Sequence, residues 1–252
     1  MNANWSIENK KVLITGGTDG IGKVTALELA KHGAHVIVVG RNPQKTENTV
    51  REIRRASGNE KVDYLLADLS EQNEVRRIAA EYRRRYDRLH VLINNAGIHQ
   101  FASAVDADLA MWDRMLDVNL RAAMHATRLA LPHIVAGARA GRRGAVIFVS
   151  SLGGKFTAPT NAGYAATKHA LTGFGGSVFE DARDFGVKVC VIYPGWTNTG
   201  LLADWLRPDE VIQPEDVAEA ARFVIAAAPT VCPTEIVLQP QSSRAARLFA
   251  TN

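Results

Sequence analysis

The stretch LITGGTDGIGK, residues 13–23, decides which fold the chain is expected to adopt. A short apolar run leads into a turn that holds Gly16, Gly20 and Gly22, and a helical pattern follows. Glycines let the backbone of such a turn approach a phosphate, and the start of a helix offers free N–H groups. Asp19, however, places a carboxylate inside the turn. The stretch therefore predicts a strand, a dinucleotide-binding loop and a helix, with an ordinary tight turn as the alternative.

Short apolar runs alternate with helical patterns along the chain. Strands are expected at 11–15, 35–40, 62–67, 90–95, 145–150, 188–193 and 235–239. Most of these runs are continuously apolar, which suits strands covered on both faces of a parallel sheet. The segments between them carry apolar residues at the three-and-four spacing of surface helices. The pattern predicts an α/β fold, with a Rossmann-like, doubly wound and mostly parallel seven-stranded sheet between two layers of helices.

The composition is that of a globular protein. Of the 252 residues 46% are hydrophobic and 22% are charged, and no linker-like segment divides them, so a single domain over 1–252 is expected. No run approaches the roughly 18 apolar residues of a membrane helix. Cys190 and Cys232 are far apart and lack metal-ligand spacing, which is typical of free thiols in a reducing compartment. We therefore expect a cytoplasmic protein with no membrane partner and no metal.

The charge pattern does not favour nucleic acid. The net charge is a mild +4, and the densest basic cluster, at 76–88, has the spacing of a helix. A solvated helix face explains this cluster better than a nucleic-acid surface does. We expect no nucleic-acid partner.

The strongest chemical signal is YAATK, residues 164–168. Tyr164 and Lys168 are four residues apart, so they share one face of the predicted helix. An ammonium near a phenol favours the phenolate, which would lower the pKa of Tyr164 from about 10 toward that of a working general acid–base. Ser151, at the end of the fifth strand, would orient an oxygen that exchanges its proton with Tyr164, although spacing alone leaves Ser150 as an alternative.

Polar residues also end the third and fourth strands. Asn94 and Asn95 either tie neighbouring strands together or hold a ligand. Asp68 either caps the next helix or accepts a hydrogen bond from an adenine amino group. Asn119 lies within a helical pattern, where by itself it would only cap or kink the helix.

Taken together, these motifs resemble the short-chain dehydrogenase/reductase family in its single-domain form. The resemblance runs over nearly the whole chain and keeps the family order of motifs. The motifs are TGGTDGIG (15–22), ADLS (67–70), NNAG (94–97), DVNL (117–120), VSS (149–151), YAATK (164–168) and YPGWTNT (193–199).

The resemblance implies a catalytic tetrad of Asn119, Ser151, Tyr164 and Lys168. Ser151 is preferred to Ser150 because the family serine lies thirteen residues before its tyrosine. Tyr164 would give a proton to a substrate carbonyl while a nicotinamide delivers hydride. Lys168 would hold the nicotinamide ribose and lower the pKa of Tyr164, and Asn119 would help to place a water that restores the proton.

The resemblance also implies the residues that meet the cofactor. They are Gly16, Thr18, Asp19, Gly20, Ile21, Gly22, Arg41, Asn42, Asp68, Leu69, Asn95, Ala96, Gly97, Tyr164, Lys168, Pro194, Gly195, Thr197 and Thr199, with Asn94 also at the central part of the site. At Thr197 the family usually has a branched aliphatic residue, so this chain departs from the pattern there.

The second strand ends in Gly40 and Arg41, without the acid that would bind a ribose 2′-hydroxyl. A guanidinium suits a 2′-phosphate, and relatives with this arrangement generally prefer NADP(H). Asp19 opposes this, because many NADP-preferring relatives have a basic residue there. A preference for NADP(H) is therefore expected, with NAD(H) not excluded.

The remaining expectations concern partners. The resemblance implies a substrate pocket built from the loop at about 195–214 together with 99–101 and 153–162, and a partly apolar carbonyl or alcohol substrate. The side chains expected in this pocket are Phe156, Trp196, Leu201, Leu202 and Trp205. A homodimer or homotetramer through 108–136 and 162–185 is also implied. The alternative function is a dinucleotide sensor or scaffold that lost the chemistry.

Overall fold

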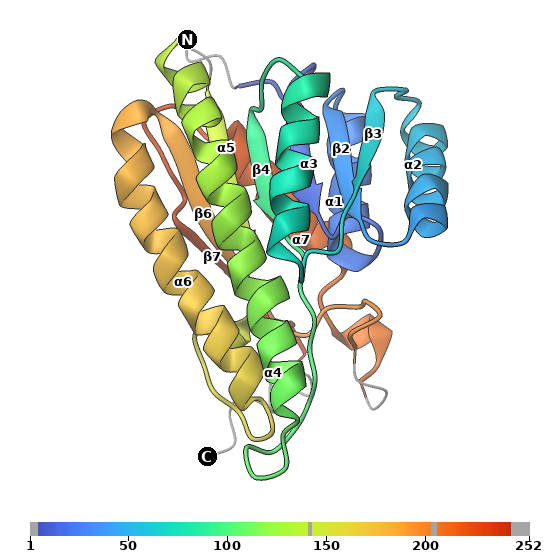
Figure 1. The fold of residues 1–252 in the computed structure, drawn as a ribbon, viewed down its shortest axis with the longest axis vertical. Helices are drawn as coiled ribbons and strands as arrows, with labels where there is room; N and C mark the ends of the chain where they lie inside the picture. Colours follow the sequence, from blue (N-terminus) through green and yellow to red (C-terminus); the bar gives the residue numbers. More distant parts are fainter. Residues whose placement is uncertain (1–4, 141–142, 203–205, 243–252) are drawn as a thin grey trace.

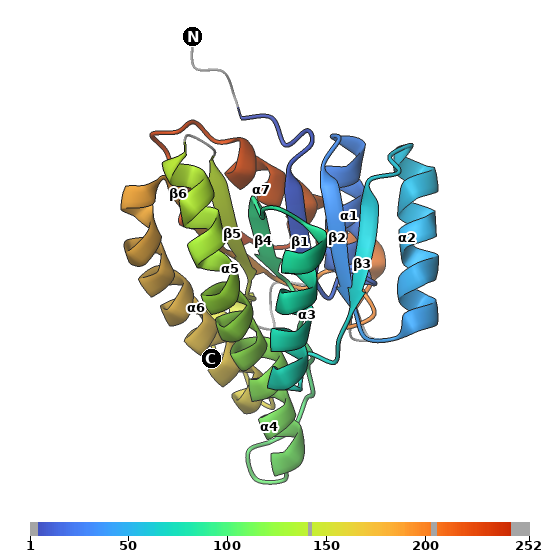
Figure 2. The ribbon, with the colours of Figure 1, turned by 45° about the horizontal axis from the view of Figure 1, so that its top comes forward.

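The computed structural model describes residues 5–140, 143–202 and 206–242. The described residues form one seven-stranded sheet in the order β3-β2-β1-β4-β5-β6-β7, and every pair of neighbours is parallel (Figures 1 and 2). The strands are β1 (Lys11–Thr15), β2 (His35–Gly40), β3 (Val62–Leu66), β4 (Val91–Asn94), β5 (Gly144–Val149), β6 (Val187–Pro194) and β7 (Glu235–Leu238). Each bound lies within one residue of its expected place, and the Rossmann-like fold class is confirmed.

Helices cover both faces of the sheet. One face carries α3 (Gln72–Arg85), α5 (Ala122–Arg139) and α6 (Ala162–Ala182), which lie in front of the sheet in Figure 1. The other carries α1 (Gly20–Lys31), α2 (Pro43–Ser57) and α7 (Pro214–Ala226). The short α4 (Leu109–Leu116) extends below the sheet together with the start of α6. No helix among the described residues is both long and apolar enough to span a membrane.

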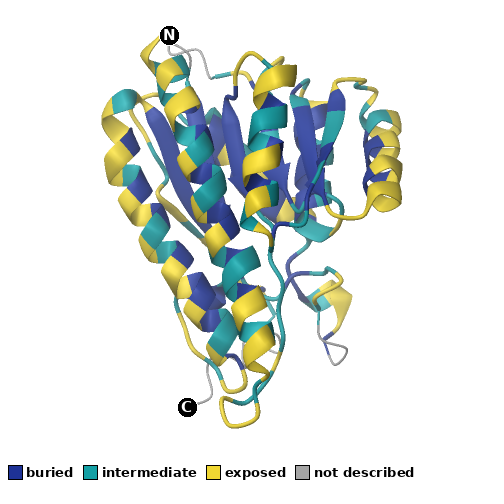
Figure 3. Ribbon diagram, viewed as in Figure 1, coloured by how far each residue is buried: buried dark blue, intermediate teal, exposed yellow. Residues whose placement is uncertain are grey.

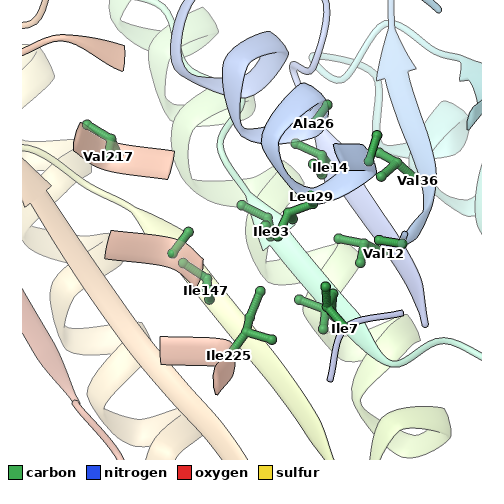
Figure 4. Packing of buried hydrophobic residues seen from close by; sticks show 14 of the residues in the cluster. Ile7, Val12, Ile14, Ala26, Leu29, Val36, Ile93, Ile147, Val217 and Ile225 are labelled. Atoms are coloured by element: carbon green, nitrogen blue, oxygen red, sulfur yellow. The ribbon is translucent and has the colours of Figure 1, made fainter. Parts of the chain in front are cut away.

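The core consists of two apolar layers, one on each side of the sheet. Figure 3 shows the central strands buried along their length. Between the sheet and α1 and α7, side chains such as Ile14, Leu29 and Ile147 pack together (Figure 4). On the opposite side Phe148 and Tyr193 are fully buried. This two-sided burial is the physical reason why the strand sequences are continuously apolar.

The exposed edge of the sheet at β3 is covered by arginine side chains. Three alternate carbonyl oxygens of this strand each accept a hydrogen bond from a guanidinium. The pairs are Arg54 with Val62 (Nε to O, 2.9 Å), Arg85 with Tyr64 (Nη1 to O, 2.9 Å) and Arg77 with Leu66. Charged side chains on an edge strand prevent it from pairing with another chain.

The order of the strands reverses between β1 and β4, whose carboxyl ends therefore open a crevice. The turn after β1 and the segment after β4 meet across it. Asn95 Nδ2 donates hydrogen bonds of 3.0 Å to the carbonyl oxygens of Thr15 and Gly16. The topology thus brings two motifs that are distant in the sequence to one edge of the sheet.

Candidate active site

The glycine turn leaves no room for side chains on its inner side. Gly16 has a φ of +64°, and a Cβ there would lie 2.8 Å from the Cα of Ala96. At Gly22 a Cβ would collide with the carbonyl oxygen of Gly16. Both positions require glycine because the backbone passes so close to its neighbours. The turn is therefore shaped by packing as much as by access for a ligand.

Asn94, the last residue of β4, and Asn95, which follows it, differ in role. Asn94 points away from the crevice, because its Nδ2 donates to Thr127 Oγ1 of α5 at 3.0 Å. Asn95 ties the crevice edges together, as described above, and Asn95, Ala96 and Gly97 line the cleft beside it. The expectation that Asn94 lines the central part of the site is therefore wrong for its side chain.

Asp19 is the N-cap of α1. Its Oδ1 accepts the amide hydrogen of Gly20 at 2.9 Å, and its Oδ2 lies 2.5 Å from Lys45 Nζ. The hydrogen bond from Lys45, ahead of the smaller opposing effect of burial, holds the pKa of Asp19 below its usual value. Lys45 is a residue of this site that was not predicted from the sequence. The available signal was its position four residues after Arg41, in the first turn of a helix that begins at Pro43.

Arg41 and Asp68 face each other at the outer end of the cleft, with Arg41 Nη1 3.6 Å from Asp68 Oδ2. Asp68 also caps its own turn, since Oδ1 accepts from Ser70 N (3.0 Å) and Ser70 Oγ (2.7 Å). Asn42 is the N-cap of α2 and accepts from the backbone N–H of Lys45. The guanidinium of Arg41 is largely exposed, so it is accessible to a ligand in the cleft.

Tyr164 and Lys168 lie on one face of α6, as their spacing predicts. Lys168 is 3% exposed, and its Nζ donates a 3.0 Å hydrogen bond to the carbonyl oxygen of Val149. Burial lowers the pKa of Lys168 to about 8. Burial also raises the pKa of Tyr164, against the opposing hydrogen bond of Ser151. The expected downward shift is therefore absent in this geometry, in which Lys168 Nζ lies 5.6 Å from the centre of the phenol ring and desolvation dominates.

The two candidate serines are separated by their contacts. Ser150 Oγ donates to the carbonyl oxygen of Lys168 at 3.2 Å, inside the protein. Ser151 Oγ accepts from Gly153 N at 3.1 Å and also hydrogen-bonds with Tyr164. Ser151 is thus the serine that touches the phenol group.

Asn119 lies in a π-helical turn, Asp117–Arg121, between α4 and α5, so the expected continuous helix is interrupted there. Its Oδ1 accepts from Ile98 N (2.8 Å), and its Nδ2 donates to Ile98 O (2.9 Å) and to Thr167 Oγ1 (3.1 Å). Local π-helical turns often occur at functional sites. Asn119 therefore clamps the segment after β4 against α6, beside Tyr164 and Lys168.

Two cavities meet at Tyr164. A cleft of about 430 Å³ runs from the glycine turn to Lys168, and a cavity of about 600 Å³ lies beyond Tyr164. Most of the expected cofactor residues line the cleft, joined by Arg114. These are Gly16, Thr18, Asp19, Gly20, Ile21, Arg41, Asp68, Leu69, Asn95, Ala96, Gly97, Tyr164, Lys168 and Thr199.

The other expected residues lie elsewhere. Gly22 and Asn42 do not line the cleft, while Pro194, Gly195 and Thr197 line the second cavity. Trp196 and Leu201 line that cavity as expected. Phe156 does not, and Leu202 packs instead against a small cluster with Leu206 and Val211. Trp205 lies outside the described residues.

The cleft fits an elongated ligand that carries phosphates. It has backbone N–H groups at the start of α1, a cationic group at each end in Arg41 and Lys168, and a carboxylate, Asp68, at the outer end. A Cβ on Gly97 would lie 3.5 Å from Lys168 Nζ and 3.6 Å from Asn119 Oδ1. A nicotinamide dinucleotide has the chemistry that these groups match.

Comparison with known proteins agrees with this geometry. Residues 10–210 match the family described as short chain dehydrogenase. The cyclohexanol dehydrogenase of Acinetobacter sp. (strain SE19) is 30% identical over 226 residues, which cover 86% of this chain and 88% of that protein. A metagenomic short-chain oxidoreductase solved in complex with NADP superposes with a TM-score of 0.81 at 29% identity, covering 94% of this chain and 100% of that one.

A further solved structure carries the other dinucleotide. The 3-ketoacyl-(acyl-carrier-protein) reductase of Brucella melitensis, complexed with NADH, has a TM-score of 0.85 at 27% identity and covers 93% of this chain and 98% of that one. Among proteins of this fold, one solved structure therefore contains NADP and another contains NADH.

Proposed function

Because the chain belongs to the short-chain dehydrogenase family and is an NAD(P)-dependent oxidoreductase, we propose that it interconverts a partly apolar ketone or aldehyde and the corresponding alcohol, with NADP(H) preferred. The observation that carries this proposal is the position of Tyr164 between the dinucleotide cleft and the second cavity. A substrate in the second cavity can reach the phenol group from one side while the dinucleotide lies on the other. The bound dinucleotide supplies the hydride for carbonyl reduction and takes it up in alcohol oxidation.

The protein's own part in the reaction is proton transfer and orientation. Tyr164 gives its phenolic proton to the carbonyl oxygen as the carbonyl carbon gains hydride, and a secondary or primary alcohol results. Ser151, in contact with Tyr164, holds the same oxygen by a hydrogen bond. In oxidation the alcohol proton passes back to Tyr164.

Lys168 and Asn119 support this step. The pKa of Lys168, lowered by burial to about 8, suits a group that loses and regains a proton near neutral pH, which allows it to restore the proton of Tyr164. Its ammonium also suits a ribose hydroxyl as an acceptor. Asn119 positions the segment at Ile98 and the α6 turn at Thr167, so it acts through its neighbours.

The preference for NADP(H) is supported by the cations at the outer end of the cleft. Arg41 is exposed there, and Lys45 adds a second cation held by Asp19. Both suit a 2′-phosphate, while Gly40 offers no carboxylate to a 2′-hydroxyl.

A homodimer or homotetramer through α5 and α6 also belongs to the proposal. These helices lie side by side in Figures 1 and 2. The exposed positions of α6 include Ala166, Ala170 and Gly173, small uncharged residues that let a second helix approach closely. Light scattering of the wild type and of Ala170→Glu tests this, since a buried glutamate at that contact would give monomers.

The test of the catalytic proposal compares the wild type with Tyr164→Phe on a panel of ketones and alcohols, following NADPH by absorbance. We expect turnover by the wild type and a loss of at least about 10²-fold in the variant, with dinucleotide binding retained. Dinucleotide binding without turnover of any compound would instead identify a sensor of the same fold.

A further inference from the structure

The described residues that line the second cavity are all uncharged. Its described lining contains no Asp, Glu, Lys or Arg side chain, whereas the adjoining cleft contains Asp19, Arg41, Asp68, Arg114 and Lys168. A charged group that entered this cavity would lose water without gaining an ionic partner among the described lining residues, which is costly. The lining therefore favours an uncharged molecule.

One side of the cavity is formed by three rings, His99, Phe101 and Trp196, which we call the aromatic wall. The His99 and Phe101 centroids are 4.0 Å apart at an interplanar angle of 86°, and those of Phe101 and Trp196 are 6.0 Å apart at 31°. His99 also packs edge-on against Tyr164, at 4.4 Å. The wall thus extends outward from the proposed acid–base residue. Phe101 remains 48% exposed, which leaves an apolar face for a ligand to cover.

His99 is held in place by the segment that precedes α6. Its Nε2 lies 2.9 Å from Asn161 Oδ1, and the backbone N–H of Ala102 donates to the carbonyl oxygen of Thr160 at 2.9 Å. Thr160 has a φ of +59°, which is unfavourable for a β-branched residue and is maintained by these contacts. Strained backbone of this kind clusters at ligand sites. The imidazole is therefore fixed relative to the ring of Tyr164.

We propose that the aromatic wall selects an uncharged substrate with an aromatic ring next to the reacting carbon, an aryl ketone or its secondary alcohol. This inference rests on the proposed function. The ring of the substrate lies against Phe101 and Trp196 while its oxygen reaches Ser151 and Tyr164. Planar rings gain contact area and favourable ring geometry there, which flexible chains of equal size do not. His99, held by Asn161, positions the wall relative to Tyr164.

The experiment compares three ketones as substrates with NADPH. Acetophenone has the ring and no charge, 2-octanone has the same number of carbons in an open chain, and 4-acetylbenzoate adds a carboxylate to the ring. We expect kcat/KM for acetophenone to exceed each of the others by about tenfold, the size of one favourable aromatic contact. Equal values for acetophenone and 2-octanone, or a preference for 4-acetylbenzoate, would overturn the inference.

Substitutions in and beside the aromatic wall test whether the wall causes this substrate selectivity. Phe101→Leu should lower kcat/KM for acetophenone by about threefold to tenfold and should affect 2-octanone less. Asn161→Ala should raise KM for acetophenone more than it lowers kcat, since it releases His99 without removing a reacting group. Phe156→Leu is the matched control, an exposed ring outside the cavity lining, and should change neither ketone. Equal effects of Phe101→Leu on both ketones would contradict the wall.

Equilibrium binding tests the selectivity of the aromatic wall independently of catalysis. Calorimetry of the three ketones with the NADP⁺ complex measures selectivity without turnover. Selective binding of acetophenone with no turnover would support the wall and overturn the catalytic proposal. Turnover of all three ketones with unselective binding would support the catalytic proposal and overturn the wall.

Discussion

Asp19 forms an ion pair with Lys45, with 2.5 Å between Oδ2 and Nζ, at the end of the cleft where Arg41 is exposed. The carboxylate, whose charge by itself opposes a 2′-phosphate, is therefore partly neutralised by a cation from the next helix. Because both groups are more than half exposed, the pair adds little to folding stability. Its main consequence is electrostatic, at the site where a phosphate would bind.

Asp19→Asn should strengthen NADPH binding by about threefold to tenfold and leave NADH binding nearly unchanged, because it removes a negative charge and frees Lys45. Asparagine is an equally good N-cap, so α1 should keep its stability. Fluorescence titration measures both dissociation constants. Glu52→Gln, which removes an exposed carboxylate paired with Lys23, is the control. An equal gain for both dinucleotides would contradict the role of Asp19.

Lys168→Met should abolish turnover while raising the free energy of unfolding of the dinucleotide-free protein by about 1 to 2 kcal/mol at pH 7. Burial lowers the pKa of Lys168 from 10.5 to about 8, so at pH 7 the folded protein carries a poorly solvated ammonium. The group binds fewer protons in the folded state between pH 8 and 10.5, and its contribution to stability therefore rises with pH through that window.

Urea denaturation at pH 7 and at pH 10 measures this effect, and the difference between Lys168→Met and the wild type should shrink at the higher pH. Lys155→Met, which breaks an ion pair with Glu235 nearer the surface, serves as the control and should change stability by less than about 1 kcal/mol. A variant that is less stable than the wild type at pH 7 would show that the hydrogen bond to Val149 outweighs desolvation.

His90 should make the protein less stable in mild acid. It is 7% exposed, its Nδ1 accepts from the backbone N–H of Lys11 at 3.0 Å, and burial, with nearby Lys10, Lys11 and Arg88, lowers its pKa from 6.5 to about 4. The unfolded chain takes up a proton at higher pH than the folded chain does, so stability is lost as the pH falls from 6.5 to about 4. The loss attributable to this one group is at most about 3 kcal/mol.

His90→Gln retains a side-chain acceptor and cannot be protonated, so the variant should lose less stability over that pH range. Thermal unfolding at several pH values measures the slope. His133→Gln, on the exposed side of α5, is the control and should keep the slope of the wild type. Parallel slopes for the wild type and His90→Gln would assign the acid sensitivity to other groups.

Arg77→Ala combined with Arg85→Ala should increase aggregation more than it lowers stability. The two guanidinium groups cover carbonyl oxygens at the free edge of β3, and the substitution exposes a strand edge that can pair with another chain. Light scattering during incubation at elevated temperature measures the rate. Arg83→Ala with Arg84→Ala removes the same charge from α3 and is the control. Equal aggregation of the two double variants would attribute the effect to net charge.

Local sequence determined the elements of the fold and the chemical identity of the site. The strands are apolar at successive positions because both faces of the sheet are covered, so they can be recognised one at a time. The spacing of Tyr164 and Lys168 on one helix is likewise a local property, and the structure retains it. The resemblance to a family implied that these segments form one site, although the sequence does not give their positions in space.

Only the tertiary structure decided how the site residues act on one another. Lys45 meets Asp19 across 26 positions, and His99 meets Asn161 across 62, so no local pattern predicts either contact. Asn94 and Asn95 are neighbours in the chain, yet one faces α5 and the other the crevice. The direction in which the pKa of Tyr164 shifts also depended on burial, which many distant segments create together. The sequence thus determined which groups are present, and packing decided their partners and protonation, because desolvation and contact depend on position in space.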